Sequence, residues 1–180
     1  MIVALAGRRV DAKHQHPPRF PSAAESVELV RRRIREKLLT LQPSALVSSA
    51  ACGADLLGLG AAGELGIRRR VILPFDRDRF RISSVIDRPG EWGPLYDAVL
   101  NDVQAAGDLL IVPFAPEDTA YLRTNHIIIE EALRLGESLQ EECLAIRVWE
   151  GKTRGKGDLT EEFGEYARKK GLGLFDILTQ

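Results

Sequence analysis

Ile2-Val-Ala-Leu-Ala6, followed at once by Gly7-Arg-Arg9, is an apolar run that ends in a polar, glycine-bearing loop. Helical-period segments separate most of the similar runs that follow along the chain. Those runs are Ala45-Leu-Val47, Arg70-Val-Ile-Leu73, Leu109-Leu-Ile-Val112, Cys143-Leu-Ala-Ile-Arg-Val148 and Leu172-Gly-Leu-Phe-Asp-Ile177. The alternation predicts an α/β fold with a mostly parallel central sheet of about six strands.

The loops after these runs are where we expect functional residues, because parallel α/β sheets bind ligands at the carboxyl ends of their strands. They begin Gly7-Arg-Arg9, Ser48-Ser-Ala-Ala-Cys-Gly-Ala-Asp55, Pro74-Phe-Asp-Arg-Asp-Arg79, Pro113-Phe-Ala115 and Gly151-Lys-Thr-Arg-Gly-Lys-Gly157. Apolar periodicity predicts helices over about 25–41, 53–66, 95–106, 119–135 and 160–169. Two long excursions, 8–22 and 75–93, remain, and loops of such length are usually functional or disordered.

The length and composition are those of an ordinary soluble domain, which we predict to span residues 1–180 as one unit. No run approaches the ~20 apolar residues of a membrane span. The N-terminus shows neither a basic region nor a cleavage site. Cys52 and Cys143 give no disulfide framework and no metal-ligand spacing. We therefore expect a cytoplasmic protein with no membrane contact, no metal and no cofactor.

The net charge of −1 argues against bulk electrostatic binding of nucleic acid. The local distribution of cations is different, because many of them fall in segments that follow strands. These are Arg8, Arg9, Lys13, Arg19, Arg77, Arg79, Arg81, Arg88, Lys152, Arg154 and Lys156. Such a rim would serve a compact anionic ligand even in a neutral protein.

The first of these loops, Gly7-Arg8-Arg9, combines a glycine that lets backbone amides face a ligand with two arginines that fork onto phosphate or carboxylate. We expect it to hold a phosphate or a ribose edge of a ligand. The alternative is a turn glycine followed by two surface arginines.

The second loop brings small residues close to a ligand in front of a helix N-terminus, which offers free amides and a partial positive charge. Ser48, Ser49, Gly53 and Asp55 would form a central cradle there. Asp55 would either cap the helix or accept a hydrogen bond from a ribose hydroxyl. The spacing matches neither a Walker loop nor a dinucleotide fingerprint.

Two later segments supply the remaining candidates. Arg123 and Asn125 differ by about 200° around a helix, so both face one ligand only if the helix begins after Thr124. In the last loop, Gly155 and Gly157 would close over a phosphate together with Thr160, which we expect to be the N-cap of the final helix. The alternative for this loop is a mobile surface segment.

With these loops in view, the chain resembles the SLOG superfamily of Rossmann-like domains, which includes the LOG ("lonely guy") phosphoribohydrolases, the DNA-processing protein A domain and many small bacterial sensor-like domains. The resemblance covers most of the chain and implies a Rossmann-like three-layer sandwich that binds a nucleotide. The motifs that carry it are Ala6-Gly-Arg-Arg9, Ser48-Ser-Ala-Ala-Cys-Gly-Ala-Asp-Leu56, Arg123-Thr-Asn125 and Gly155-Lys-Gly-Asp-Leu-Thr160. The second is the most specific of them.

The last motif departs from the LOG pattern, a Gly-Gly-x-Gly-Thr-x-x-Glu loop whose glutamate serves hydrolysis. Phe163 stands where that glutamate is expected. A nucleotide ligand is therefore implied more strongly than hydrolysis of it. If the chain is an enzyme, Asp55, Asp76 and Glu130 are the candidates to replace the missing carboxylate.

These observations favour a module that binds or senses a nucleotide-type small molecule. The alternatives are an N-glycosidase that splits base from ribose phosphate, and a single-stranded nucleic-acid binder, which the neutral charge and few aromatic residues disfavour. We also expect a homo-oligomer, because three consecutive isoleucines, Ile127 to Ile129, cover most of a helix's circumference and one of them needs cover from a partner.

Overall fold

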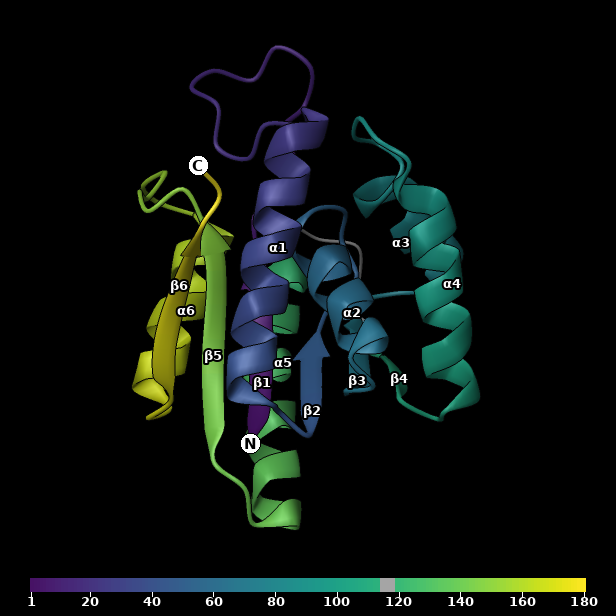
Figure 1. Cartoon of the computed structure of the whole chain (residues 1–180), viewed down its shortest axis with the longest axis vertical. Helices are drawn as coiled ribbons and strands as arrows, with labels where there is room; N and C mark the ends of the chain where they lie inside the picture. Colours follow the sequence, from purple (N-terminus) through teal and green to yellow (C-terminus); the bar gives the residue numbers. More distant parts are fainter. Residues whose placement is uncertain (114–118) are drawn as a thin grey trace.

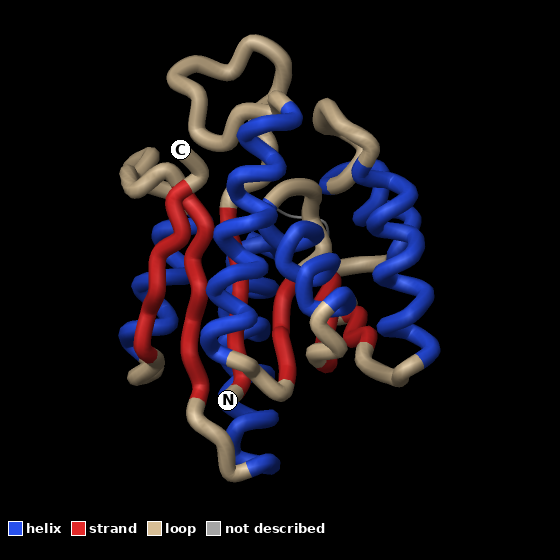
Figure 2. Tube along the Cα trace, viewed as in Figure 1, coloured by secondary structure: helices blue, strands red, loops and turns tan. Residues whose placement is uncertain are grey.

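The computed structural model describes residues 1–113 and 119–180, and the predicted loop at Pro113-Phe-Ala115 therefore lies mostly outside the described residues. One parallel sheet forms the centre of the fold, in the order β4-β3-β2-β1-β5-β6 (Figure 2). Its strands are β1 (Ile2–Gly7), β2 (Ala45–Ser48), β3 (Arg68–Leu73), β4 (Leu109–Ile111), β5 (Cys143–Trp149) and β6 (Gly173–Leu178). The predicted parallel sheet of about six strands is confirmed, and every pairing in it is parallel.

Helices cover both faces of this sheet, which gives the predicted three-layer Rossmann-like sandwich (Figure 1). The first face carries α1 (Ala24–Leu41), α2 (Ala54–Glu64), α3 (Arg77–Ser84) and α4 (Trp92–Ala105). The second carries α5 (Thr119–Leu139) and α6 (Leu159–Lys169). Strand order reverses between β1 and β5, and that switch point is where open α/β sheets form ligand crevices.

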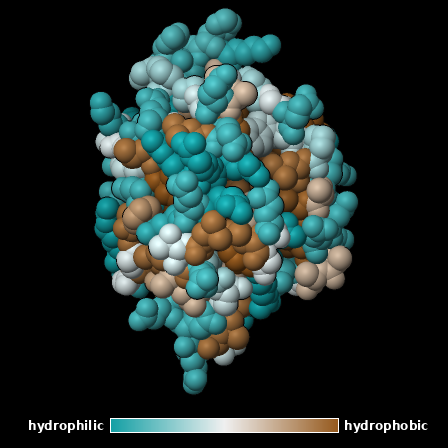
Figure 3. All heavy atoms as spheres, in the orientation of Figure 1, coloured by the Kyte–Doolittle hydropathy of each residue, from teal (hydrophilic) through white to brown (hydrophobic). Residues whose placement is uncertain are grey.

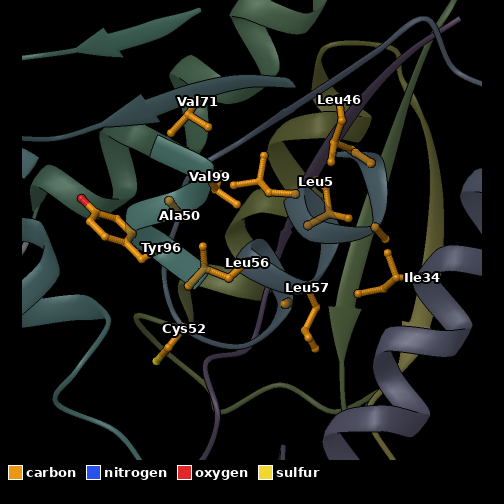
Figure 4. Packing of buried hydrophobic residues seen from close by; sticks show 14 of the residues in the cluster. Leu5, Ile34, Leu46, Ala50, Cys52, Leu56, Leu57, Val71, Tyr96 and Val99 are labelled. Carbon is orange, nitrogen blue, oxygen red and sulfur yellow. The ribbon is translucent and has the colours of Figure 1, made fainter. Parts of the chain in front are cut away.

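The first apolar run owes its continuity to this double cover. Val3 and Leu5 of β1 point into the core beneath α1 and α2, whereas Ile2 and Ala4 point into the core beneath α5 and α6. Figure 4 shows Leu5 close to Leu46 in the first of these cores. A strand buried on both faces cannot alternate polar and apolar residues, so it reads as an unbroken apolar run.

Helix α2 lies between the sheet, α1 and α4, and it is buried on nearly all sides. Its small residues permit this close approach. A Cβ placed on Gly58 would meet the Leu5 side chain at 3.0 Å, and Ala61 and Ala62 are also buried. The residues that follow β2 are thereby held tightly against the end of β1.

The three consecutive isoleucines of α5 pack against the sheet of the same chain. Ile128 and Ile129 are fully buried against the sheet, and Ile127 is half-buried and packs against the same core. The uncovered isoleucine on which the expectation of a homo-oligomer rests is therefore not found. Self-association stays a prediction that light scattering would test.

The long 8–22 loop stands above the carboxyl edge of the sheet, where hydrophilic residues dominate the surface (Figures 1 and 3). Buried Val10 and Phe20 anchor it to the core, and Asp11 Oδ2 accepts the backbone N–H groups of Arg19 and Phe20. The Thr179 hydroxyl donates to the Arg19 carbonyl oxygen, so the last residues of the chain also hold this loop. Within the described ranges, no helix combines the length and apolar character of a membrane span.

Candidate functional site

Two adjoining cavities open at the carboxyl ends of β1 and β2. The larger one, the outer cleft, has a volume of about 470 Å³. The smaller one, the inner pocket, measures about 100 Å³ and lies against the start of α2. Both are lined by Gly7, Arg9, Ala51, Tyr121, Leu159 and Thr160. The sheet edge predicted to carry the site therefore contains two adjoining cavities, which together are called the crevice.

Gly7 of the first predicted loop and Gly53 of the predicted cradle allow the chain segments at the floor of the site to pack closely. A Cβ on Gly7 would lie 2.5 Å from the Val148 carbonyl oxygen of β5. Gly53 has a φ of +99°, and a Cβ there would lie 2.7 Å from the Arg8 carbonyl oxygen. Only glycine fits that backbone conformation and spacing without strain. Both glycines thus pack backbone on backbone, in addition to any contact they make with a ligand.

Arg8 is buried and bound on two sides by carboxylates. Its Nη1 and Nη2 donate to Asp158 at 2.5 and 2.7 Å, and its Nε and Nη2 donate to Glu150 at 2.6 and 3.0 Å. A further bond runs from Nη2 to the Lys152 carbonyl oxygen. The guanidinium predicted to hold a ligand phosphate therefore ties the end of β1 to the loop after β5.

The outer cleft is strongly cationic. Its lining includes five arginines, which come from the loops after β1, α3 and β5, against one aspartate. Those arginines are Arg8, Arg9, Arg19, Arg88 and Arg154, and the aspartate is Asp11. Cations from separate loops that converge on one crevice create a field that attracts an anion.

Three of these arginines are only loosely paired. The Nε atoms of Arg19, Arg88 and Arg154 each lie 3.6 Å from a carboxylate oxygen, of Glu150, Asp87 and Asp158 respectively. That distance is beyond hydrogen-bond reach. Within the described part of the chain, the Nε of Arg88 has no hydrogen-bond partner. These side chains keep donors for a ligand, unlike Arg8.

Arg9 lines both cavities. Its Nη2 donates to Asp87, while its buried Nε has no partner among residues 1–113 and 119–180. Hydrogen bonding to Asp87, and the charge of that carboxylate, raise the pKa of Arg9 even though burial lowers it. The guanidinium thus remains charged at the junction of the outer cleft and the inner pocket.

A group of hydroxyls also lines the outer cleft. Ser84 Oγ lies 3.1 Å from the Tyr121 hydroxyl and 3.2 Å from Ser83 Oγ. The Tyr121 ring meets Phe75 edge to face, with centroids 5.9 Å apart. This packing fixes a neutral polar wall formed by α3 and the first turns of α5.

Asp55 lines the inner pocket and is only 7% exposed. Its Oδ2 accepts the Ala51 N–H at 3.3 Å, but its Oδ1 has no hydrogen-bond partner among the described residues. Burial raises the pKa of Asp55 to about 7, against the opposing effects of the Ala51 and Gly7 amides and of Arg9. A buried carboxylate oxygen without a partner is costly, and a buried carboxyl with a raised pKa in a cleft is a candidate functional group.

The rest of the inner pocket is neutral and polar. Ser49, Thr124, Asn125 and Thr160 line it. The Asn125 amide donates to the Leu159 carbonyl oxygen at 2.9 Å, which joins α5 to the start of α6. Ser48 lies behind the pocket, fully buried, where its hydroxyl donates to the Leu5 carbonyl oxygen.

The last loop differs from the prediction in two respects. The N-cap of α6 is Asp158, not Thr160, because the Asp158 carboxylate accepts the N–H groups of Thr160 and Glu161. These amides are then already bound to an anion of the chain itself. Gly155 and Gly157 are exposed and do not line either cavity, whereas Thr160 lines both.

Three other predicted residues lie apart from the crevice. Arg123 is exposed on α5, since that helix begins at Thr119 rather than after Thr124 and turns Arg123 away from Asn125. Asp76 caps α3 by accepting the Arg79 N–H. Glu130 is exposed on α5 and accepts the Tyr166 hydroxyl. Of the three candidate carboxylates, Asp55 alone lines either cavity.

Arg19, Arg88 and Arg154 belong to the predicted cationic rim but are not among the predicted ligand contacts. Each lies in a loop after a strand or within a long excursion, and this position in the sequence is the feature that could have indicated a ligand contact. The pairing of Ser84 with Tyr121 had no such signal, because the two residues belong to different helices and approach only in the folded chain.

No family profile matches the chain, and no curated protein matches it in sequence. Among solved structures, it matches the crystal structure of DNA processing protein A from Streptococcus pneumoniae, with 14% sequence identity and a TM-score of 0.42. The match covers 96% of this chain and 57% of that one, so this chain spans little more than half the length of the solved structure. The match concerns the layout of the fold and says nothing of what this chain binds.

Proposed function

We propose that this protein binds a nucleotide-type small molecule in the crevice at the carboxyl ends of β1 and β2, with the phosphates in the outer cleft. The observation that carries this proposal is the convergence of Arg9, Arg19, Arg88 and Arg154 on one cleft from three separate loops. A planar guanidinium forks onto phosphate oxygens, and several of them together suit a compact polyanion.

The crevice also has the position and proportions of a ligand site. It lies beside the switch point between β1 and β5, where the chain leaves the two strands toward opposite faces of the sheet. Its volume of about 470 Å³ is within the range of small-molecule pockets. The cations concentrate there although the whole chain carries a net charge of only −1.

Thermal unfolding with a panel of ligands tests the proposal. Mono-, di- and cyclic nucleotides and ADP-ribose derivatives would each be added at increasing concentration. A ligand present at 100 times its dissociation constant stabilises the fold by roughly 2.7 kcal/mol, which gives a clear upward shift of Tm. A panel that leaves Tm unchanged throughout would reject nucleotide binding.

Variants identify the site of that binding. The double substitution Arg88→Ala, Arg154→Ala removes two loosely paired cations from the outer cleft, so it should abolish the ligand-induced shift while the unliganded Tm stays close to that of the wild type. Arg31→Ala is the matched control, because Arg31 pairs with Glu64 on the outer surface of α1 and α2, away from the cleft. Equal loss of the shift in both variants would count against the cleft.

The second candidate function is N-glycosidase activity, which one observation favours. Asp55 is the candidate carboxylate that lines the crevice, and burial raises its pKa to about 7, which suits a general base at neutral pH. Asp55 would take a proton from water as the hydroxyl adds to C1′ of the ribose and the bond from C1′ to the nucleobase nitrogen breaks. That proton would then pass to the departing nucleobase. Phe163 cannot take this role, because it is fully buried in the core beneath α5 and α6.

Chromatography of the products after incubation with nucleoside monophosphates tests hydrolysis directly. General base assistance contributes about 10²–10⁴-fold, so Asp55→Asn should reduce any release of base by that factor. Glu130→Gln, on the exposed face of α5, should leave the release unchanged. Absence of free base from the wild-type protein would leave binding as the function.

A further inference from the structure

The two cavities differ sharply in chemistry. The outer cleft is lined by five arginines and one aspartate. The inner pocket is lined by one arginine, Arg9, and by one carboxylate, Asp55, and its other polar side chains are neutral hydroxyls and an amide. A ligand with a charged part and a neutral polar part therefore has one favourable orientation in the crevice.

We propose that the inner pocket is a ribose subsite, in which Asp55 accepts a hydrogen bond from a ribose hydroxyl and thereby selects ribonucleotides over deoxyribonucleotides. This inference rests on the proposed function, since it places the sugar of the same ligand whose phosphates lie in the outer cleft. It adds the orientation of the ligand and the residue that determines the choice of sugar.

The unpaired oxygen of Asp55 is the first argument for a hydroxyl. An ionised carboxylate only accepts hydrogen bonds, and Oδ1 makes no hydrogen bond with the residues the structure describes, although the Gly7 amide lies near enough to lower the pKa of this carboxyl. A phosphate would bring a like charge to a side chain that is 93% buried, and the two would repel each other. A hydroxyl brings a donor and no charge.

The hydrogen-bonding groups that line the inner pocket are the second argument, because they suit a sugar better than a nucleobase. Guanine presents two adjacent donors that need both oxygens of a carboxylate, but Oδ2 of Asp55 already accepts the Ala51 N–H. A sugar hydroxyl needs a single oxygen. The hydroxyls of Ser49, Thr124 and Thr160 and the Asn125 amide surround the pocket with neutral donors and acceptors, the pattern that suits a ring bearing several hydroxyls.

A site of this kind discriminates strongly. A ligand that lacks the hydroxyl leaves the buried carboxylate oxygen without a partner, and the cost of an unpaired buried group is larger than the gain from a typical hydrogen bond. We therefore expect wild-type protein to bind a ribonucleotide at least about tenfold more tightly than its matching deoxyribonucleotide.

Calorimetric titration with matched sugars tests this. ADP, GDP, CDP and UDP would each be compared with the 2′-deoxy and 3′-deoxy forms at pH 8, where the Asp55 carboxylate is ionised. Asp55→Asn keeps the shape of the side chain and removes its charge. The variant should lose most of the preference for ribose and keep its affinity for pyrophosphate, which reaches only the outer cleft.

Asp76→Asn is the control, because Asp76 caps α3 and lies outside both cavities, and asparagine caps equally well. It should retain the full preference for ribose. Equal affinity for ribo- and deoxyribonucleotides in the wild type would overturn the ribose subsite and leave nucleotide binding intact. The ribose subsite would also be overturned if Asp55→Asn abolished a preference among nucleobases but kept the preference for ribose. If none of the four diphosphates binds, the ribose subsite falls, and the thermal panel of mono- and cyclic nucleotides and ADP-ribose derivatives decides whether the proposed function falls with it.

Discussion

Arg8 and Asp158 form a two-pronged ion pair, with Nη1 to Oδ1 at 2.5 Å and Nη2 to Oδ2 at 2.7 Å, although 150 positions separate them in the chain. Both side chains are almost completely buried. The same Asp158 carboxylate caps α6 and accepts the Arg154 N–H. One contact thus fixes the end of β1, the loop after β5 and the start of α6 around the crevice.

We expect Arg8→Ala to destabilise the fold by about 3–5 kcal/mol, because it leaves the buried carboxylates of Asp158 and Glu150 without their cation. Urea unfolding measures this. Arg31→Ala breaks an exposed pair with Glu64 and should cost less than about 1 kcal/mol. If Arg8→Ala had a small effect on stability and caused a large loss of ligand affinity, Arg8 would instead contact the ligand, as its position in the sequence predicts.

Asp55→Asn should stabilise the unliganded protein at neutral and alkaline pH. Burial raises the folded-state pKa of Asp55 to about 7, above its unfolded value near 4, so the folded state binds the extra proton and wild-type stability falls as pH rises from about 4 through 7. The gap between variant and wild type should grow across that window to the order of a few kcal/mol. Unfolding midpoints at a series of pH values measure it, and a gap independent of pH would contradict the raised pKa.

Thr179→Val should loosen the 8–22 loop without unfolding the protein. The Thr179 hydroxyl donates to the Arg19 carbonyl oxygen, and a net hydrogen bond contributes about 1 kcal/mol, so trypsin cleavage at exposed Lys13 should become about fivefold faster. Thr40→Val is the matched control, since that hydroxyl bonds only its own helix α1 at the Glu36 carbonyl oxygen. Unchanged cleavage in Thr179→Val would show that the buried Val10 and Phe20 anchors hold the loop unaided.

Single arginine substitutions should separate the residues that line the outer cleft from those that do not. Arg88→Ala removes a cation that lines the outer cleft and should weaken nucleotide binding by about 10- to 100-fold, the range for a charge-assisted hydrogen bond. Arg123→Ala, on the exposed face of α5, should leave affinity within about twofold. The reverse ranking in calorimetric titrations would place the ligand along α5 rather than in the cleft.

Most of the residues predicted to form a site do lie around one crevice, but their contacts differ from those that the sequence predicts. Gly7, Arg9, Ser49, Asp55 and Asn125 do meet at one sheet edge, because the carboxyl ends of parallel strands converge wherever the strands pair. Helix phase was the weak point. Because α5 begins at Thr119, Arg123 and Asn125 both lie within the helix, about 200° apart, and Arg123 turns outward.

Charge pairing was the other weak point. A local pattern marks Arg8 as a cation in a glycine-bearing loop, and that description is equally true of Arg9. Nothing near either residue in the sequence shows that Arg8 meets two carboxylates, whereas Arg9 meets one and retains an unpaired Nε among the described residues.

The amino-acid sequence by itself determined the layers of this protein, because burial on two faces imposes unbroken apolar runs on strands and a 3.6-residue period on helices. It also determined that cations follow the strands. Only the tertiary structure decided which of those cations remain available to a ligand. That choice depends on the strand order, which sets β5 beside β1 and so brings Glu150 and Asp158 to Arg8, and it leaves the buried Asp55 oxygen without such a donor among the described residues.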